Sequence, residues 1–155
     1  MPTPRTADGP GPAGAPLAGW TVTAEPDHEF YAATGVRSSR ARFPVDGRPR
    51  RFLLTRRQIW IGRRGNTLRP RPEVDLGGWP HDPGVSRLHA LLLARPGGWT
   101  LLEPGSLGGT AVNGVYEPIP VDVPIPVGHG TRIHVGLWTT ITLRLEATCR
   151  PRPAG

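Results

Sequence analysis

The sequence predicts an all-β fold, an antiparallel sandwich or barrel, from three observations. Short β-prone runs follow one another between residues 43 and 145, separated by turn signals such as Asp46-Gly47 and Asn113-Gly114. Apolar and polar residues alternate over residues 139–145, as in a strand with one buried and one solvated face. A helical segment long enough for a crossover between parallel strands is missing between the runs.

The expected elements begin at residue 20. Residues 20–24 form a short β-prone run, and residues 25–35 are expected to contain one or two helical turns ended by Gly35. Further strands are expected over residues 43–45, 51–55, 58–61, 89–94, 99–102, 110–112, 131–135 and 139–145.

The ends of the chain differ in composition from its middle. Residues 1–19 contain five prolines and four glycines, which predicts a disordered leader because such a segment buries too little apolar surface to order itself. We expect residues 20–42 to form an N-terminal extension packed on the domain, residues 43–146 to form the sandwich, and residues 147–155 to form a flexible tail.

The charge balance favours anionic partners. All 19 basic residues are arginine against 12 acidic residues, for a net charge of +7, and guanidinium groups bind phosphate and carboxylate through paired hydrogen bonds. A GC-rich genome explains the absence of lysine equally well. Cys149 is the single cysteine, which fits a reducing compartment. No apolar run approaches the roughly 18 residues of a membrane span, so a cytoplasmic protein without a membrane partner is expected.

Enzyme signatures are missing. Ser86 and His89 lie three residues apart, but the surrounding sequence is not the G-x-S-x-G elbow of a nucleophile. The glycine-rich residues 105–110 lack the lysine and the following helix of a nucleotide-binding loop. The five histidines and Cys149 show no metal-ligand spacing. We therefore expect no catalysis, no metal and no cofactor.

Five loop motifs follow one another in a fixed order: Ile61-Gly62-Arg63-Arg64, Val85-Ser86-Arg87-Leu88-His89-Ala90, Gly105-Ser106-Leu107-Gly108-Gly109-Thr110, Val112-Asn113-Gly114 and Gly130-Thr131-Arg132-Ile133-His134-Val135-Gly136. This order resembles the forkhead-associated (FHA) domain, whose pattern runs G-R, S-x-x-H, G-S-x-N-G-T, V-N-G and G-D-x-I-x-[LIV]-G. The resemblance covers residues 43–145. Residues 20–24 and 82–86 are also similar to actinobacterial versions of the family.

The resemblance implies a β-sandwich of about eleven strands that binds phosphothreonine peptides on loops at one end. Arg63 would contact the phosphate, Ser86 would donate its hydroxyl and backbone N–H, and Arg87 would add a further contact. Leu107 and Gly108 occupy positions that contact the peptide. The remaining motif residues would support the structure: Gly62, His89, Gly109, Thr110, Asn113 and Gly114. Physically, a phosphate with about −1.5 to −2 charges is matched by a guanidinium and a serine hydroxyl in a tight loop.

The chain departs from the family pattern in one loop. Gly108 stands where the family has an asparagine that hydrogen-bonds the ligand backbone, and Leu107 stands where a hydroxyl residue is frequent. Glu103-Pro104 also replaces a more usual aspartate-containing lead. The residues expected to bind the phosphate are therefore kept, whereas the expected binding of the peptide backbone is weakened.

Two other functions remain open. The same loops would serve a scaffold that binds proteins without phosphate, and the doublets Arg50-Arg51, Arg56-Arg57 and Arg63-Arg64 would serve nucleic-acid binding. Nucleic acid is the weaker alternative because no aromatic platform motif accompanies the arginines. The favoured partners are phosphothreonine-containing proteins that a serine/threonine protein kinase modifies.

Overall fold

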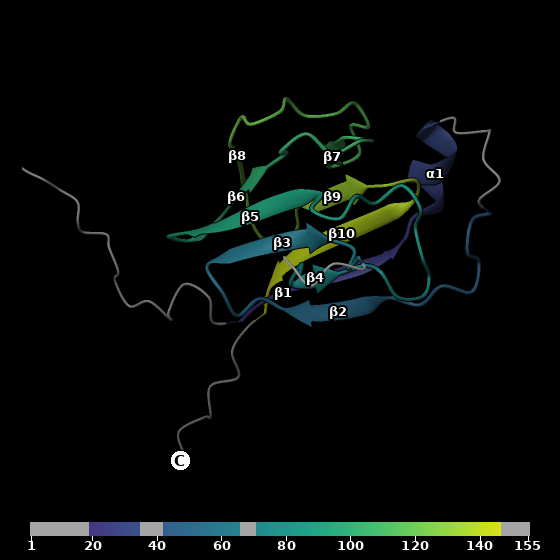
Figure 1. Ribbon diagram of the computed structural model, residues 1–155. Helices are drawn as coiled ribbons and strands as arrows, with labels where there is room; N and C mark the ends of the chain where they lie inside the picture. Colours follow the sequence, from purple (N-terminus) through teal and green to yellow (C-terminus); the bar gives the residue numbers. More distant parts are fainter. Residues whose placement is uncertain (1–18, 35–41, 66–70, 147–155) are drawn as a thin grey trace, which may run out of the picture.

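The structure, a computed structural model, describes residues 19–34, 42–65 and 71–146, and these residues contain ten strands in two five-stranded sheets (Figure 1). The elements are β1 (Trp20–Pro26), α1 (His28–Thr34), β2 (Arg50–Leu53), β3 (Gln58–Gly62), β4 (Val74–Asp75), β5 (Ala90–Arg95), β6 (Gly98–Leu102), β7 (Thr110–Val112), β8 (Ile125–Val127), β9 (Arg132–Val135) and β10 (Thr139–Leu145). The all-β sandwich expected from the sequence is confirmed.

The first sheet has the strand order β2-β1-β10-β9-β7, and the second has the order β4-β3-β5-β6-β8. All pairs are antiparallel except β3 with β4, which run parallel. Strand β1 pairs with β10 along its whole length and with β2 on its other side. The segment expected to be an extension of the domain therefore supplies an inner strand of the first sheet.

Three details differ from the sequence prediction. Residues 43–45 do not form a strand: the carbonyl of Pro44 accepts a hydrogen bond from the Gly47 N–H at 3.0 Å, and the chain turns there instead. Strands β4 and β8 were missed, because they have two and three residues and β8 contains a proline. The predicted tails lie outside the described residues, apart from Gly19. Within the described ranges, no helix has the length and apolarity needed to cross a membrane.

The core lies between the two sheets and takes alternate residues from each. Strands β3 and β5 contribute Ile59, Ile61 and Leu92, all at most 1 % exposed. Trp20 of β1 and Trp99 of β6 meet across the core edge to face, with ring centroids 6.2 Å apart and an interplanar angle of 88°. The core therefore fixes the sheets against each other and holds the loops at their ends in place.

A chain of hydrogen bonds fastens α1 to the first sheet. Asp27 caps the helix by accepting from the Phe30 N–H at 3.2 Å, and its other carboxylate oxygen accepts from the Thr140 hydroxyl at 2.7 Å. The Thr140 hydroxyl lies 2.8 Å from His134 Nδ1, and His134 Nε2 accepts from the Gly114 N–H at 2.9 Å. These partners require a neutral imidazole with its proton on Nδ1.

Burial and the neighbouring Arg132 lower the pKa of His134 to about 4, against a smaller opposing effect of Asp27. The unfolded chain binds a proton at this residue below about pH 6.5, whereas the folded chain does so only near pH 4. Protonation therefore favours the unfolded state, and stability is lost as the pH falls through this window.

We expect the free energy of unfolding to fall by about 1–2 kcal/mol between pH 7 and pH 5 because of His134 alone. Chemical denaturation of the wild type and of His134→Gln at both pH values measures this contribution as the difference between their pH slopes. His81→Gln, at an exposed histidine, is the matched control and should keep the wild-type slope. Equal slopes for the wild type and His134→Gln would contradict the assignment.

Candidate functional site

Three loops meet at the end of the sandwich where α1 lies: the loop after β3, the loop before β5, and the loop between β6 and β7. The long segment between β4 and β5 runs along this end (Figure 1). Four of the sequence-predicted residues line one open depression here, which we call the Arg63 depression; its lining is Arg63, Pro83, Gly84, Val85, Ser86, Leu107 and Gly108.

The backbone after β3 runs in close contact with the loop before β5. The Arg63 N–H donates to the Arg87 carbonyl at 3.2 Å, and the His89 N–H donates to the Ile61 carbonyl at 2.8 Å. A Cβ atom at Gly62 would lie 1.8 Å from the Arg87 carbonyl oxygen. Only glycine therefore allows the two backbones to approach this closely.

The Arg63 side chain is half-buried and oriented by the same loop. Its Nε donates to the Val85 carbonyl at 2.5 Å. Within the described part of the chain, no carboxylate forms an ion pair with its guanidinium. The η nitrogens of an oriented guanidinium without a carboxylate are suited to an anionic ligand.

Ser86 contributes its hydroxyl to the depression but not its backbone N–H. The Ser86 N–H donates to His89 Nδ1 at 3.0 Å, and the Ser86 hydroxyl oxygen accepts from the Leu107 N–H at 3.3 Å. The expectation that the Ser86 N–H also contacts the ligand is corrected here, because the buried imidazole of His89 already uses that donor. The hydroxyl proton of Ser86 carries the remaining donor capacity.

His89 bridges two of the three loops. With Nδ1 accepting from Ser86, its proton lies on Nε2, which donates to the Gly109 carbonyl at 2.8 Å. The ring is fully buried, and this burial lowers its pKa despite the opposing effects of the Gly109 carbonyl, Glu103 and Asp82. His89 therefore stays neutral and holds the loops of Ser86 and Gly109 at a fixed separation.

Glu103 organises the loop between β6 and β7, a role that the sequence analysis did not assign. Its buried carboxylate accepts from the N–H of Gly105 at 2.6 Å, from the N–H and hydroxyl of Ser106, and from the Thr110 hydroxyl at 2.5 Å. Burial acts to raise the pKa of Glu103, but the hydrogen bonds from Thr110, Ser106 and Gly105 outweigh it and lower the pKa. The ionised carboxylate thus replaces a sheet partner for this loop.

Asp82 fastens the loop before β5 to the turn between β9 and β10. Its buried carboxylate accepts from the N–H groups of Gly84, Leu137 and Trp138 and from the Thr139 hydroxyl, at 2.7–3.1 Å. At Gly136, where φ is +69°, a Cβ atom would lie 2.5 Å from the Asp82 carboxylate. The Asp-Pro-Gly turn signal in residues 82–84 hinted at this loop, but not at its distant partners.

The loop that departs from the family pattern is open. Leu107 is 82 % exposed. A Cβ atom at Gly108 would meet a single atom within 4 Å, the Gly84 carbonyl oxygen at 3.9 Å, and Gly108 has no positive φ. Position 108 therefore has room for a side chain and imposes no backbone strain on one.

The other predicted residues lie outside the Arg63 depression. Arg87 is exposed and its guanidinium lies beside Gly65, because a Cβ atom there would be 2.7 Å from Arg87 Nε. Asn113 and Gly114 have φ values of +51° and +79°, and the Val115 N–H donates to the Val112 carbonyl at 3.1 Å. These angles are those of a type I′ turn, so the turn signal Asn113-Gly114 is confirmed as a turn.

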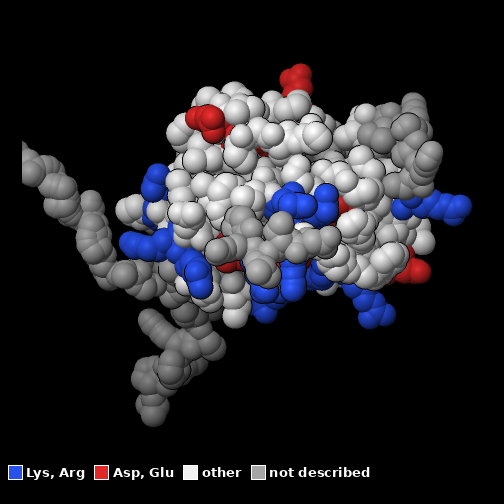
Figure 2. All heavy atoms as spheres, in the orientation of Figure 1, with Lys and Arg blue, Asp and Glu red and all other residues white. Residues whose placement is uncertain are grey.

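Basic side chains lie in the middle and lower parts of the face in Figure 2, and acidic side chains stand out at its upper edge and at its lower right. Two of the arginines considered for nucleic acid already have protein partners. Arg51 forms an ion pair with Glu146 at 3.0 Å, and Arg50 Nη2 donates to the Pro80 carbonyl at 3.4 Å. Among the described residues, no group of three or more His, Cys, Asp or Glu could hold a metal ion.

A family model, that of the FHA domain, matches residues 59–136, which is 78 of the 155 residues. Among solved structures, the chain is similar to the Synechocystis protein Slr1951 (TM-score 0.55, 17 % identity, 83 % of this chain and 99 % of that one). It is also similar to the FHA domain of an Arabidopsis thaliana hypothetical protein (TM-score 0.54, 18 % identity, 85 % and 91 %). Mycobacterium tuberculosis EmbR in complex with a low-affinity phosphopeptide matches with a TM-score of 0.50 at 18 % identity (83 % and 26 %). No protein with curated annotation matches the chain.

Replacing His89 by alanine removes both hydrogen bonds of the bridge and leaves the Ser86 N–H and the Gly109 carbonyl unpaired. We expect a loss of about 1–3 kcal/mol in the free energy of unfolding, which thermal unfolding of His89→Ala detects as a lowered midpoint. His81→Ala serves as the control at an exposed histidine. A midpoint like that of the wild type would show that the bridge contributes no stability.

Proposed function

Since the chain belongs to the FHA domain family, we propose that it is a non-catalytic module that binds phosphothreonine peptides through Arg63 and Ser86. The partners are proteins phosphorylated by a serine/threonine protein kinase. A cytoplasmic location and an actinobacterial type of FHA domain stay predictions from the sequence. The phosphopeptide held by EmbR supports a ligand of this class.

One observation carries the proposal: an oriented guanidinium and a serine hydroxyl line the same open depression. The depression has no carboxylate in its lining, so a doubly charged phosphate would contact no like charge there. Buried hydrogen bonds hold the loops in place before a ligand binds. This lowers the entropy cost of ordering the loops on binding. Recognition of a phosphate by arginine on preformed loops is an established mode of peptide binding.

Arg87 and Leu107 belong to the proposal in a secondary way. Arg87 lies beside the depression and contributes positive charge rather than a lining contact. Leu107 and Gly108 line the depression without a side-chain hydrogen-bonding group. The ligand backbone therefore lacks the amide partner that the family asparagine supplies, and we infer weak binding of the peptide outside its phosphate.

Removing either phosphate contact should weaken binding strongly. A hydrogen bond to a charged group contributes about 1.5–3 kcal/mol, so Arg63→Ala and Ser86→Ala should each lower phosphopeptide affinity roughly ten- to a hundredfold. Titration calorimetry with a degenerate phosphothreonine peptide library measures the effect, and circular dichroism verifies the fold of each variant. Arg95→Ala, at an exposed arginine on β5, is the matched control and should bind like the wild type.

Two results would overturn this function. Equal affinity for the library and its unphosphorylated twin would favour a phosphate-independent scaffold. Preferential binding to duplex DNA with a steep loss of affinity at higher salt would favour nucleic acid.

Restoring an amide at position 108 should tighten binding. The open surroundings of Gly108 accept a side chain, and one neutral hydrogen bond contributes about 0.5–1.5 kcal/mol, or roughly a two- to tenfold gain. We expect this gain for Gly108→Asn with a phosphothreonine peptide, and a similar or larger gain for Leu107→Thr with Gly108→Asn. Calorimetry with the phosphoserine twin measures selectivity, and Gly108→Ala is the control without an amide. No gain in either variant would favour the scaffold.

A further inference from the structure

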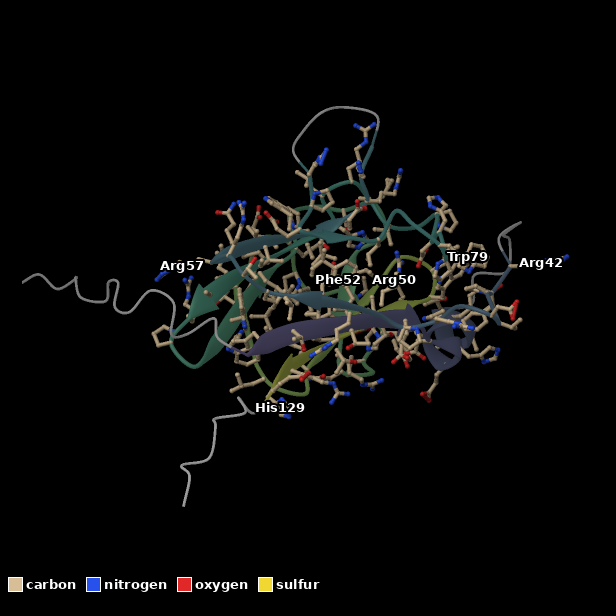
Figure 3. All side chains as sticks on the ribbon, turned by 90° about the horizontal axis from the view of Figure 1, so that it is seen from below. Arg42, Arg50, Phe52, Arg57, Trp79 and His129 are labelled. Carbon is tan, nitrogen blue, oxygen red and sulfur yellow. The ribbon has the colours of Figure 1, made fainter. Side chains whose placement is uncertain are left out.

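Strand β2 forms an edge of the first sheet. In the described part of the chain it pairs with β1 alone, and it stands at the end of the strand order. It lies along the lower edge of the sandwich in Figure 1. Figure 3 shows the molecule from below, and its labels place Phe52 and Arg50 between Arg57 and Arg42. The backbone groups of such an edge are a template for a further strand.

The hydrogen-bond register shows which backbone groups of β2 face away from β1. The Leu54 N–H donates to the Trp20 carbonyl at 3.0 Å. Paired and unpaired residues alternate along an antiparallel strand, so Phe52 also directs its N–H and C=O towards β1. Arg51 and Leu53 direct theirs away from it. The backbone of these two residues is therefore open to an added strand.

The side chains on the outer face of this edge are accessible. Phe52 packs against the core, so Arg51 and Leu53 project from the opposite face of the sheet. Leu53 is 66 % exposed. Arg51 forms its ion pair with Glu146 at 3.0 Å, but both side chains are exposed. Since an exposed ion pair contributes little stability, Arg51 is able to exchange this partner for another carboxylate.

The charge around the edge is of one sign. Residues 48–57 contain no acidic residue and five arginines: Arg48, Arg50, Arg51, Arg56 and Arg57. Among the described residues, only Arg51 of these five forms an ion pair. Basic side chains accordingly gather along the lower part of the face in Figure 2. Like charges oppose the pairing of this edge with the same edge of a second copy, whereas they attract a strand that carries carboxylates.

We propose that β2 binds an acidic, extended segment of a partner protein as an added strand. The backbone of Arg51 and Leu53 would supply the hydrogen bonds, and the surrounding arginines would select for acidic side chains. No residue of β2 lines the Arg63 depression, so this surface is separate from the proposed phosphate site. A nucleic acid is the weaker candidate, because its backbone cannot continue the ladder and Leu53 offers it no polar contact.

The probe is a fluorescein-labelled, eight-residue peptide of alternating glutamate and valine, titrated against the full chain at low salt by fluorescence anisotropy. An added strand turns only one of its edges to β2. Methylation of the backbone nitrogens of one alternate set, glutamates or valines, should therefore abolish binding, and methylation of the other set should be tolerated. The same peptide with lysine in place of glutamate is the control for charge and should not bind.

Amide hydrogen exchange, followed by NMR, locates the contact. At saturating peptide, exchange at Leu53 and Arg51 should slow about tenfold or more, whereas exchange at Phe52, which already pairs with β1, should change less.

Variants separate the backbone contact from the charge. Leu53→Pro removes an N–H that faces away from β1 and should lower affinity roughly tenfold, whereas Leu53→Val keeps the N–H and should bind like the wild type. Arg51→Gln should weaken binding roughly three- to tenfold, and Glu146→Gln, which frees Arg51, should tighten it. Arg95→Gln, at an exposed arginine on β5, is the matched control. Circular dichroism verifies the fold, and if Leu53→Pro is unfolded, the methylated peptides carry the test of the backbone contact.

Several results would overturn this inference. They are the absence of peptide binding at low salt, loss of binding with both methylated peptides or with neither, and unchanged exchange at Arg51 and Leu53. Dimerisation of the chain that Leu53→Pro abolishes would assign the edge to a second copy instead. Tighter binding of duplex DNA that Arg51→Gln weakens and Leu53→Pro does not would assign it to nucleic acid. Phosphothreonine peptides should bind all these variants like the wild type, so failure here leaves the proposed function intact.

Discussion

The buried imidazole of His89 joins two loops by pairing one backbone group from each of them. It accepts from the Ser86 N–H and donates to the Gly109 carbonyl, at 3.0 and 2.8 Å. The Ser86 hydroxyl and the open surface of Gly108 keep their positions because this ring spans the distance between their loops. Buried backbone groups must be paired. Loops at this end of the sandwich can therefore form a site only if a buried polar side chain pairs the backbone groups that the sheets leave unpaired.

Two buried carboxylates, those of Asp82 and Glu103, pair other backbone groups of these loops. Asp82 and Glu103 accept several hydrogen bonds each, and donors around Glu103 outweigh burial and lower its pKa. His89 and His134 each donate one hydrogen bond and accept another, so burial keeps them neutral and lowers their pKa. None of these four residues lines the Arg63 depression. These buried polar groups therefore fix the positions of the loops, whereas Arg63 supplies the positive charge in the lining of the Arg63 depression.

How far the sequence predicts this arrangement depends on whether a signal is local. The alternation that marks β10 and the Asn113-Gly114 turn follow from period and φ preference, so both were predicted correctly. The run around Pro44 was wrongly expected to be a strand, because tertiary packing favours a turn there. The motif pattern identified both Ser86 and His89, but it did not show that the Ser86 N–H donates to His89 Nδ1 rather than to a ligand. Asp82 and Glu103 look like surface acids in sequence, since their donors come together only on folding.

In the proposed function, the departure at Gly108 bears on what the site can recognise. A phosphate and a guanidinium supply affinity but little discrimination, because every phosphothreonine peptide carries the same group. An amide at position 108 would add a backbone contact, which is equally blind to sequence. In the proposed function, selectivity among phosphothreonine proteins therefore has to come from contacts with ligand side chains, because neither the phosphate contact nor a backbone contact depends on the ligand sequence.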